Sequence, residues 1–277
     1  MIRISAKDIG DLTRSIFATL LKWLTIGIGL SLATPAQAVD SNLYLIALAG
    51  QSNMTGAGDV KLLPAGFPTN GPRIWNFTNA DTWEPAREPI DSNDRQVDMV
   101  SRDRHPGVGP ALAMADAFTA KYPQVSVGLI PCGKSGSSIE EWQPDPSRSS
   151  LYGSCLYRQK QAALQGKLRA LVFWQGGQDG KDKKTAKHWG ENFKRMVTAW
   201  RADMGNPKLP VILLVLKPGT EQTLRKYPVR QQQLSVQMPY LTKIETIGYD
   251  YNGDDIHLTT AGQLALGPVI AAALPAP

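Results

Sequence analysis

Five short apolar runs, separated by helical patterns, constrain the fold more than any other feature of this sequence. Most of them lack the apolar–polar alternation of a half-exposed strand, so they are typical of strands that are buried on both faces. Strands that alternate with helices predict a parallel sheet with helices on both sides. The predicted strands are Leu43–Ala49, Val125–Pro131, Leu171–Trp174, Val211–Leu216 and Ile244–Gly248.

The sequence therefore predicts an α/β fold, in which ligands bind beyond the carboxyl ends of the strands. One segment interrupts the alternation: residues 55–109 contain six prolines, and we expect an ordered excursion that walls one side of the site. The predicted helices are Pro110–Tyr122, Leu156–Gln165, Ala186–Met204, Leu224–Met238 and Thr260–Leu274.

The first 38 residues have the organisation of a secretory signal peptide. Basic side chains precede an apolar run, Trp23–Ala33, and the sequence Ala-Gln-Ala at 36–38 is an A-x-A cleavage site. We expect cleavage near Ala38 and export to the periplasm or the cell exterior, which leaves residues 39–277 as a single domain with one full core. The alternative is a retained membrane anchor, although Lys22 interrupts the wider apolar stretch Ile16–Ala33.

The charge of the chain gives no indication of a nucleic-acid partner. The formal net charge is +6, and the densest basic cluster, residues 181–187, is typical of a solvated helix start. Beyond the N-terminal stretch, no apolar run is long enough to span a bilayer. Cys132 and Cys155 could form a disulfide in an exported protein or remain two small buried side chains, and the sequence leaves both open.

A serine directly after the first predicted strand is the candidate nucleophile. Ser52 follows Gly50, which allows the backbone to turn sharply, and its hydroxyl needs a base to take its proton. The stretch at 251–262, YNGDDIHLTTAG, supplies His257 with Asp254 three residues before it. Such a loop lets the carboxylate bind the imidazole Nδ1–H and fix the tautomer of the base. A D-x-x-H loop alone is common, but together with Ser52 it predicts a Ser-His-Asp triad.

The other histidines and carboxylates are weaker candidates. His188 lies in a charged helical pattern and is most simply a surface residue, and His105 lies in the long proline-rich loop. Asp250 and Asp255 are rivals of Asp254, which has the better spacing from the histidine.

An oxyanion hole is the third requirement of this chemistry. The backbone N–H of Ser52 can supply one donor, and Gly136 in the turn PCGKSGSSIEEW can supply a second. The stretch FWQGGQDG places Gln175 at a strand end and Gln178 beyond two glycines. A side-chain amide is a good donor to a developing negative charge, so we predict Gln175 as the third donor, with Gln178 as the alternative.

Five sequence blocks that occur in order resemble one family. They are similar to the sialate O-acetylesterase-like branch of the SGNH/GDSL hydrolases, which includes the family 6 carbohydrate esterases. The resemblance implies a three-layer α/β/α sandwich with a mainly parallel, five-stranded, flavodoxin-like sheet. It also implies hydrolysis of acetyl esters on sugars without a metal or other cofactor, with Ser52 as nucleophile, His257 as base and Asp254 as its partner. The blocks are GQSNMTG at 50–56, GVGPALAMA at 107–115, GLIPCGKSGSSIEEW at 128–142, FWQGGQD at 173–179 and DDIHLT at 254–259.

The block FWQGGQD, which carries the predicted third oxyanion donor, departs from the pattern of this branch, which is Trp-x-Gln-Gly-Glu-Ser-Asp. Gly177 stands where the branch has glutamate. Gln175 matches the glutamine of the branch, whereas an alignment to the Gly-x-Asn-Asp block of the wider superfamily would give the donor role to Gln178.

The candidate substrate contacts are Gln51 and Asn53, beside the nucleophile, and Trp142, whose ring could stack on a sugar. Ordinary packing is the alternative for Trp142. The predicted function is an exported serine esterase that removes acetyl groups from a carbohydrate. The alternatives are a general short-chain acyl or aryl esterase with the same triad, and a carbohydrate-binding protein that has lost catalysis. The sugar, the acetylated position and the oligomeric state are left open by the sequence.

Overall fold

The computed structural model describes residues 42–92, 100, 106–219 and 229–277. The predicted signal peptide, His105 and the start of the helix predicted over Leu224–Met238 lie outside these residues. The described strands form one sheet in the order β3-β2-β4-β1-β5-β6-β7. They are β1 (Leu43–Gly50), β2 (Ile74–Phe77), β3 (Trp83–Pro85), β4 (Val127–Gly133), β5 (Gly166–Trp174), β6 (Val211–Val215) and β7 (Leu241–Glu245).

Five of these strands form the predicted flavodoxin-like sheet. In the order β4-β1-β5-β6-β7 every neighbouring pair is parallel, which confirms the predicted fold class. The predicted number of strands was too low, because a short hairpin extends the sheet beyond β4. Its strand β2 pairs parallel with β4, and β3 pairs antiparallel with β2. These strands have four and three residues, too few to give a periodic pattern, and β3 ends at a proline.

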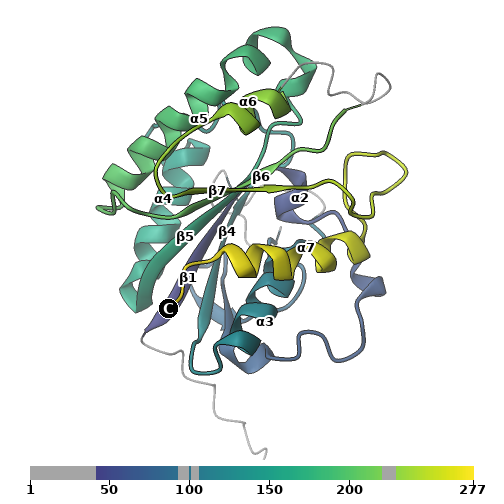
Figure 1. The fold of residues 1–277 in the computed structure, drawn as a ribbon. Helices are drawn as coiled ribbons and strands as arrows, with labels where there is room; N and C mark the ends of the chain where they lie inside the picture. Colours follow the sequence, from purple (N-terminus) through teal and green to yellow (C-terminus); the bar gives the residue numbers. More distant parts are fainter. Residues whose placement is uncertain (1–41, 93–99, 101–105, 220–228) are drawn as a thin grey trace, which may run out of the picture. The chain divides into compact units, whose positions relative to one another are not determined.

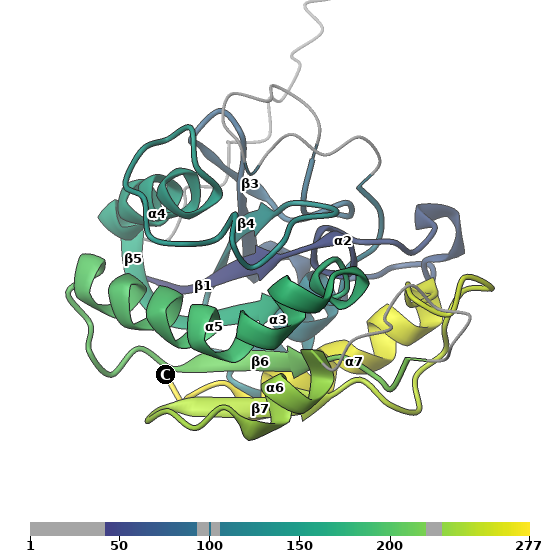
Figure 2. The ribbon, with the colours of Figure 1, turned by 90° about the horizontal axis from the view of Figure 1, so that it is seen from above.

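Helices cover both faces of the sheet (Figures 1 and 2). On one face α3 packs against α7 so closely that a Cβ on Gly267 would lie 2.5 Å from the Cβ of Ala113. The other face carries α4, α5 and α6. Among the described helices, none combines the length and the apolar character needed to cross a bilayer. The helices are α2 (Ser52–Thr55), α3 (Ala111–Lys121), α4 (Leu151–Ala162), α5 (Lys183–Asp203), α6 (Val229–Ser235) and α7 (Thr260–Ala273).

The core lies between the sheet and these helices. All eight residues of β1 are buried, and so are all residues of β4 and β6, as expected for central strands with helices on both faces. The longest of the described helices, α5, is capped by Asp182, whose carboxylate accepts hydrogen bonds from the backbone N–H groups of Lys184 and Thr185. The buried face of α5 carries Trp189 and Trp200, which anchor the helix to the sheet.

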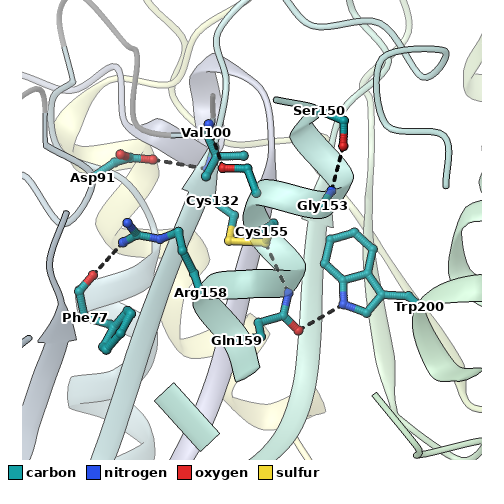
Figure 3. Close-up of a disulfide and its surroundings, with 12 residues drawn as sticks. Phe77, Asp91, Val100, Cys132, Ser150, Gly153, Cys155, Arg158, Gln159 and Trp200 are labelled. Atoms are coloured by element: carbon teal, nitrogen blue, oxygen red, sulfur yellow. Dashed lines mark hydrogen bonds between the residues drawn. A yellow bond between two sulfur atoms is a disulfide. The ribbon is translucent and has the colours of Figure 1, made fainter. Parts of the chain in front are cut away.

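A disulfide between Cys132 and Cys155 joins the end of β4 to α4 (Figure 3). The two Cα atoms lie 5.4 Å apart, and both side chains are fully buried. Gln159 Nε2 donates a hydrogen bond to Cys155 Sγ at 3.1 Å, and Trp200 Nε1 donates to Gln159 Oε1 at 2.9 Å. Of the two alternatives that the sequence left open for these cysteines, the structure has the disulfide. The bond fixes the end of β4 just before the turn that contains Gly136.

Candidate active site

The sharp turn at the end of β1 places Ser52 at the carboxyl edge of the sheet. Gly50 has φ of 137°, and a Cβ there would lie 2.2 Å from the carbonyl oxygen of Trp174 on the neighbouring strand β5. Only glycine fits this conformation and this close approach. The chain then enters α2, whose first residue is Ser52.

Ser52, His257 and Asp254 form one hydrogen-bonded chain. Ser52 Oγ lies 2.7 Å from His257 Nε2, and His257 Nδ1 lies 2.5 Å from Asp254 Oδ2. The other carboxylate oxygen, Asp254 Oδ1, accepts hydrogen bonds from the backbone N–H groups of Ile256 and His257, each at 2.9 Å. Partial burial acts to raise the pKa of Asp254, but the hydrogen bonds from His257 and Ile256 outweigh it and hold this pKa below its usual value. Asp254 therefore stays ionised and can stabilise a charged imidazole.

The rival carboxylates point elsewhere. Asp250 Oδ2 accepts a hydrogen bond from Thr259 Oγ1 at 2.7 Å, and Asp255 forms an ion pair with Lys217. His188 lies exposed on α5. Of the three neighbouring aspartates in this loop, Asp254 is the one whose carboxylate contacts the imidazole.

A cavity of about 410 Å³ opens on the serine and the histidine. Among the described residues that line it, one side chain is cationic, Lys181, and none is a carboxylate. Gly177, at the position where the branch pattern has glutamate, adds no side chain to the wall. The lining residues are Gln51, Ser52, Ser135, Gly136, Gly177, Gln178, Lys181, Ile256 and His257.

Several hydrogen-bond donors in this lining have no partner in the described part of the protein, and three of them lie where an oxyanion would form. These three are the backbone N–H groups of Ser52 and Gly136 and the side-chain amide of Gln178. Gly136 has φ of 72°, and no atom lies within 4 Å of where its Cβ would be. Donors that are left unpaired beside a serine nucleophile are what an oxyanion hole requires.

Gln175 lies beneath this cavity, which corrects the prediction that its side chain is an oxyanion donor. It is fully buried, and its Nε2 donates to the carbonyl oxygen of Ser137 at 2.8 Å and to the carboxylate of Asp179. Its Oε1 accepts a hydrogen bond from Trp189 Nε1 at 2.8 Å. Because these partners occupy both ends of the amide, the alternative donor, Gln178, is the glutamine that reaches the cavity.

Asp179 connects the two loops that carry the donors. Its two carboxylate oxygens each lie 3.1 Å from the backbone nitrogen of Ile139, three residues after Gly136. Burial raises the pKa of Asp179 to about 6, although the hydrogen bonds from Gln175 and Ile139 act in the opposite direction. Asp179 follows Gln178 directly, so this buried network holds the two glutamine positions and the Gly136 turn in one arrangement.

The family model described as "Carbohydrate esterase, sialic acid-specific acetylesterase" matches residues 41–275. The chain belongs to this family. The resemblance carried by the five sequence blocks is therefore confirmed.

A relative of this carbohydrate esterase occurs in Arabidopsis thaliana. A protein of Arabidopsis thaliana named "Probable carbohydrate esterase" is 30% identical over 241 residues, which are 82% of this chain and 88% of that protein. The X-ray structure of the Arabidopsis protein matches with a TM-score of 0.72 at 28% identity, over 84% of this chain and 97% of the other. A carbohydrate acetylesterase from Xanthomonas citri matches with a TM-score of 0.57 at 18% identity, over 83% and 55% of the two chains.

The structure of NanS shows the same fold. It matches with a TM-score of 0.63 at 17% identity, over 85% of this chain and 97% of NanS. At this identity, as for the Xanthomonas protein, the match concerns the arrangement of the chain and not the substrate.

Two of the three predicted substrate contacts of the esterase are corrected by the structure. Trp142 is fully buried, donates a hydrogen bond from Nε1 to Ser137 Oγ and stacks on Trp200, so it packs under the loop. Asn53 is 2% exposed, and its amide is bonded to the loop that carries His257. Gln51 lines the cavity, although its Oε1 accepts a hydrogen bond from the Gly176 backbone at 3.2 Å.

Sequence reasoning did not assign Lys181 to the site. The available signal was its position two residues after the block FWQGGQD at 173–179, because this block follows a strand end at the carboxyl edge of the sheet. The sequence pattern alone indicates only a basic cluster at residues 181–187.

Proposed function

We propose that this carbohydrate esterase removes O-acetyl groups from a sugar by a Ser-His-Asp acyl-enzyme mechanism. The observation that carries the proposal is the hydrogen-bonded chain from Ser52 through His257 to Asp254 at the wall of the cavity. A general esterase with the same triad is the alternative, since the chain of three residues does not by itself select the acyl group.

In the first half of the proposed reaction, His257 Nε2 takes the Ser52 proton while Ser52 Oγ attacks the acetyl carbonyl carbon. Asp254 stabilises the imidazolium that forms. The carbonyl oxygen becomes an oxyanion, which the Ser52 and Gly136 N–H groups and the Gln178 amide bind. The ester bond then breaks, and the sugar hydroxyl leaves with the proton that His257 returns.

The second half releases acetate. Water enters the site, gives its proton to His257 and attacks the acetyl-enzyme carbonyl, and the same donors bind the second oxyanion. Collapse of this intermediate breaks the bond to Ser52 Oγ, which recovers its proton from His257. The enzyme returns to its starting state with acetate as the second product.

We also propose that the esterase acts outside the cytoplasm, after cleavage near Ala38. The basic and apolar pattern of residues 1–38 supports this proposal. The buried Cys132–Cys155 bond supports it as well, because disulfides persist mainly in oxidising compartments. Protein recovered from an exporting host and sequenced from its N-terminus should begin near Val39, and a first residue of Met1 would contradict the proposal.

The test of the activity is a comparison of esters. The purified protein is incubated with acetylated xylan, with O-acetyl sialic acid and with aryl esters of increasing acyl length, and acid release is measured. We expect acetate from at least one sugar and its loss in Ser52→Ala. Hydrolysis of aryl acetate without release from any sugar would favour a general esterase, and no release from any ester would favour a carbohydrate-binding protein.

A further inference from the structure

The side chain of Asn53 lies buried between the helix that carries the nucleophile and the loop that carries the base. Asn53 is the residue after Ser52 in α2. Its Nδ2 donates to the carbonyl oxygen of Ile256 at 2.9 Å, and its Oδ1 accepts from the backbone N–H of Leu258 at 3.0 Å. These two peptide groups flank His257. One planar amide therefore holds the backbone on both sides of the imidazole.

The orientation of this amide follows from its partners. A carbonyl oxygen can only accept and a backbone N–H can only donate, so Nδ2 must face Ile256 and Oδ1 must face Leu258. Gln263 of α7, which is fully buried, places its Nε2 3.3 Å from Asn53 Oδ1 and 3.3 Å from the carbonyl oxygen of Asn53. Gln263 thus supports the same orientation from the other side.

Two other contacts hold the His257 loop to itself or to the end of β6. The Asn252 N–H donates to the carbonyl oxygen of His257 at 2.7 Å, within the loop. The ion pair between Asp255 and Lys217 joins the loop to the end of β6. Neither contact involves α2, so neither sets the position of the imidazole relative to Ser52.

We propose that Asn53 is a positioning residue that sets the distance between Ser52 Oγ and His257 Nε2 and does not bind the substrate. The inference rests on the proposed function, since it needs Ser52 and His257 to be nucleophile and base. Its physical basis is the steep dependence of such a reaction on geometry, in which a misplacement of about 1 Å can cost roughly 10²-fold in rate. Asn53 is 2% exposed, so it offers almost no surface for a sugar to contact.

The kinetic test uses Asn53→Ala, which removes both hydrogen bonds, and Asn53→Asp, which keeps the shape but replaces the donor that faces Ile256. With an aryl acetate as substrate, we expect kcat to fall by roughly 10²-fold in Asn53→Ala. It should fall by more than about tenfold in Asn53→Asp, with KM within about twofold of the wild type in both, because the ground-state contacts of the substrate are unchanged.

The structural test is amide hydrogen exchange at Leu258, whose N–H is the group that Asn53 Oδ1 protects. Exchange should be at least tenfold faster in Asn53→Ala than in the wild type. The matched control is Asn192→Ala on α5, another buried amide, whose Oδ1 accepts a hydrogen bond from Arg195. This control should leave both kcat and Leu258 exchange within about twofold of the wild type.

Each alternative result has a separate meaning. A raised KM with unchanged kcat in Asn53→Ala would show that Asn53 binds substrate and would overturn the proposal. Unchanged kcat and KM, or Leu258 exchange equal to that of the wild type, would overturn it as well. An inactive wild-type protein would count against the proposed function, whereas Leu258 exchange would still show whether Asn53 holds the His257 loop.

Discussion

Gln175 Nε2 donates a hydrogen bond to the carbonyl oxygen of Ser137, so the end of β5 supports the turn that carries Gly136 from beneath. The amide that matches the family glutamine therefore acts inside the protein. Gln175 can therefore affect the proposed reaction only through the position of that turn, and the groups that line the cavity are the candidates for binding the oxyanion.

Removal of the Gln178 side chain should lower the catalytic rate, whereas removal of the Gln175 side chain should lower the stability of the fold. We expect Gln178→Ala to lower kcat by roughly 10²–10³-fold, the loss typical of one oxyanion donor, with unchanged thermal stability. Gln175→Ala should destabilise the fold by about 1–3 kcal/mol, because it leaves buried partners such as Asp179 and Trp189 unpaired. Steady-state kinetics and urea unfolding of both variants measure the two effects. A stable Gln175→Ala variant with the larger loss of kcat would refute this assignment.

Asp254 and Asp255 are adjacent in the sequence, so variants of the two form a matched pair that tests the contact between Asp254 and His257. Asp254→Asn should lower kcat by roughly 10³–10⁴-fold, because an amide in this position favours the wrong tautomer of His257. Asp255→Asn should cost much less, since Asp255 pairs with Lys217 and not with the imidazole. Both variants remove one carboxylate from the same loop, and pH–rate profiles on an aryl acetate compare them. Equal losses would show that the loop charge, and not the contact with His257, matters.

The stability of the protein should decrease with pH between about pH 4 and 6 through Asp179. Burial raises the pKa of Asp179 from 3.8 to about 6, so the folded state binds this proton more tightly than the unfolded state. The contribution is fully present below about pH 4 and is lost as the pH rises through 6. It amounts to about 3 kcal/mol at 1.36 kcal/mol per pKa unit.

The difference between the wild type and Asp179→Asn isolates this contribution in urea unfolding at several pH values. The variant lacks the titrating group, so the decrease between pH 4 and 6 should be smaller by that amount. Glu88, whose pKa burial raises to about 8, titrates in both proteins and cancels in the comparison. Parallel stability curves for the two proteins would rule out a raised pKa at Asp179.

The cation in the cavity should distinguish acidic from neutral substrates. Because none of the described lining residues is a carboxylate, Lys181 is available to a charged sugar. We expect Lys181→Met to raise KM for O-acetyl sialic acid by about twofold to fivefold, as for an exposed ion pair, with little change for acetylated xylan or aryl acetate. Lys208→Met, which removes an exposed lysine remote from the cavity, is the control. Equal changes in KM for charged and neutral esters would contradict a role in charge recognition, and added salt should weaken the expected effect.

The central strands could be predicted because each is a continuous apolar run between turn residues. The hairpin β2–β3 could not, since strands of three and four residues beside prolines are stabilised by pairing within the sheet and not by a local pattern.

Ser52, Asp254 and His257 could be singled out because their roles need only a strand end and a short loop. The direction of a side chain at the end of a strand is a tertiary property, so spacing alone could not separate Gln175 from Gln178. The burial of Asn53 and Trp142 depends in the same way on loops that are distant in the sequence.

The hydrogen bond between Ser52 and His257 joins residues 205 positions apart. In the proposed mechanism the nucleophile emerges early from the ribosome and the base among the last residues, so a partly synthesised chain has no assembled catalytic centre. Under this proposal an acetyl ester can be cleaved only once α7 and the preceding loop have docked on the first strand. Hydrolytic activity is thus a direct report that the whole domain is complete and folded.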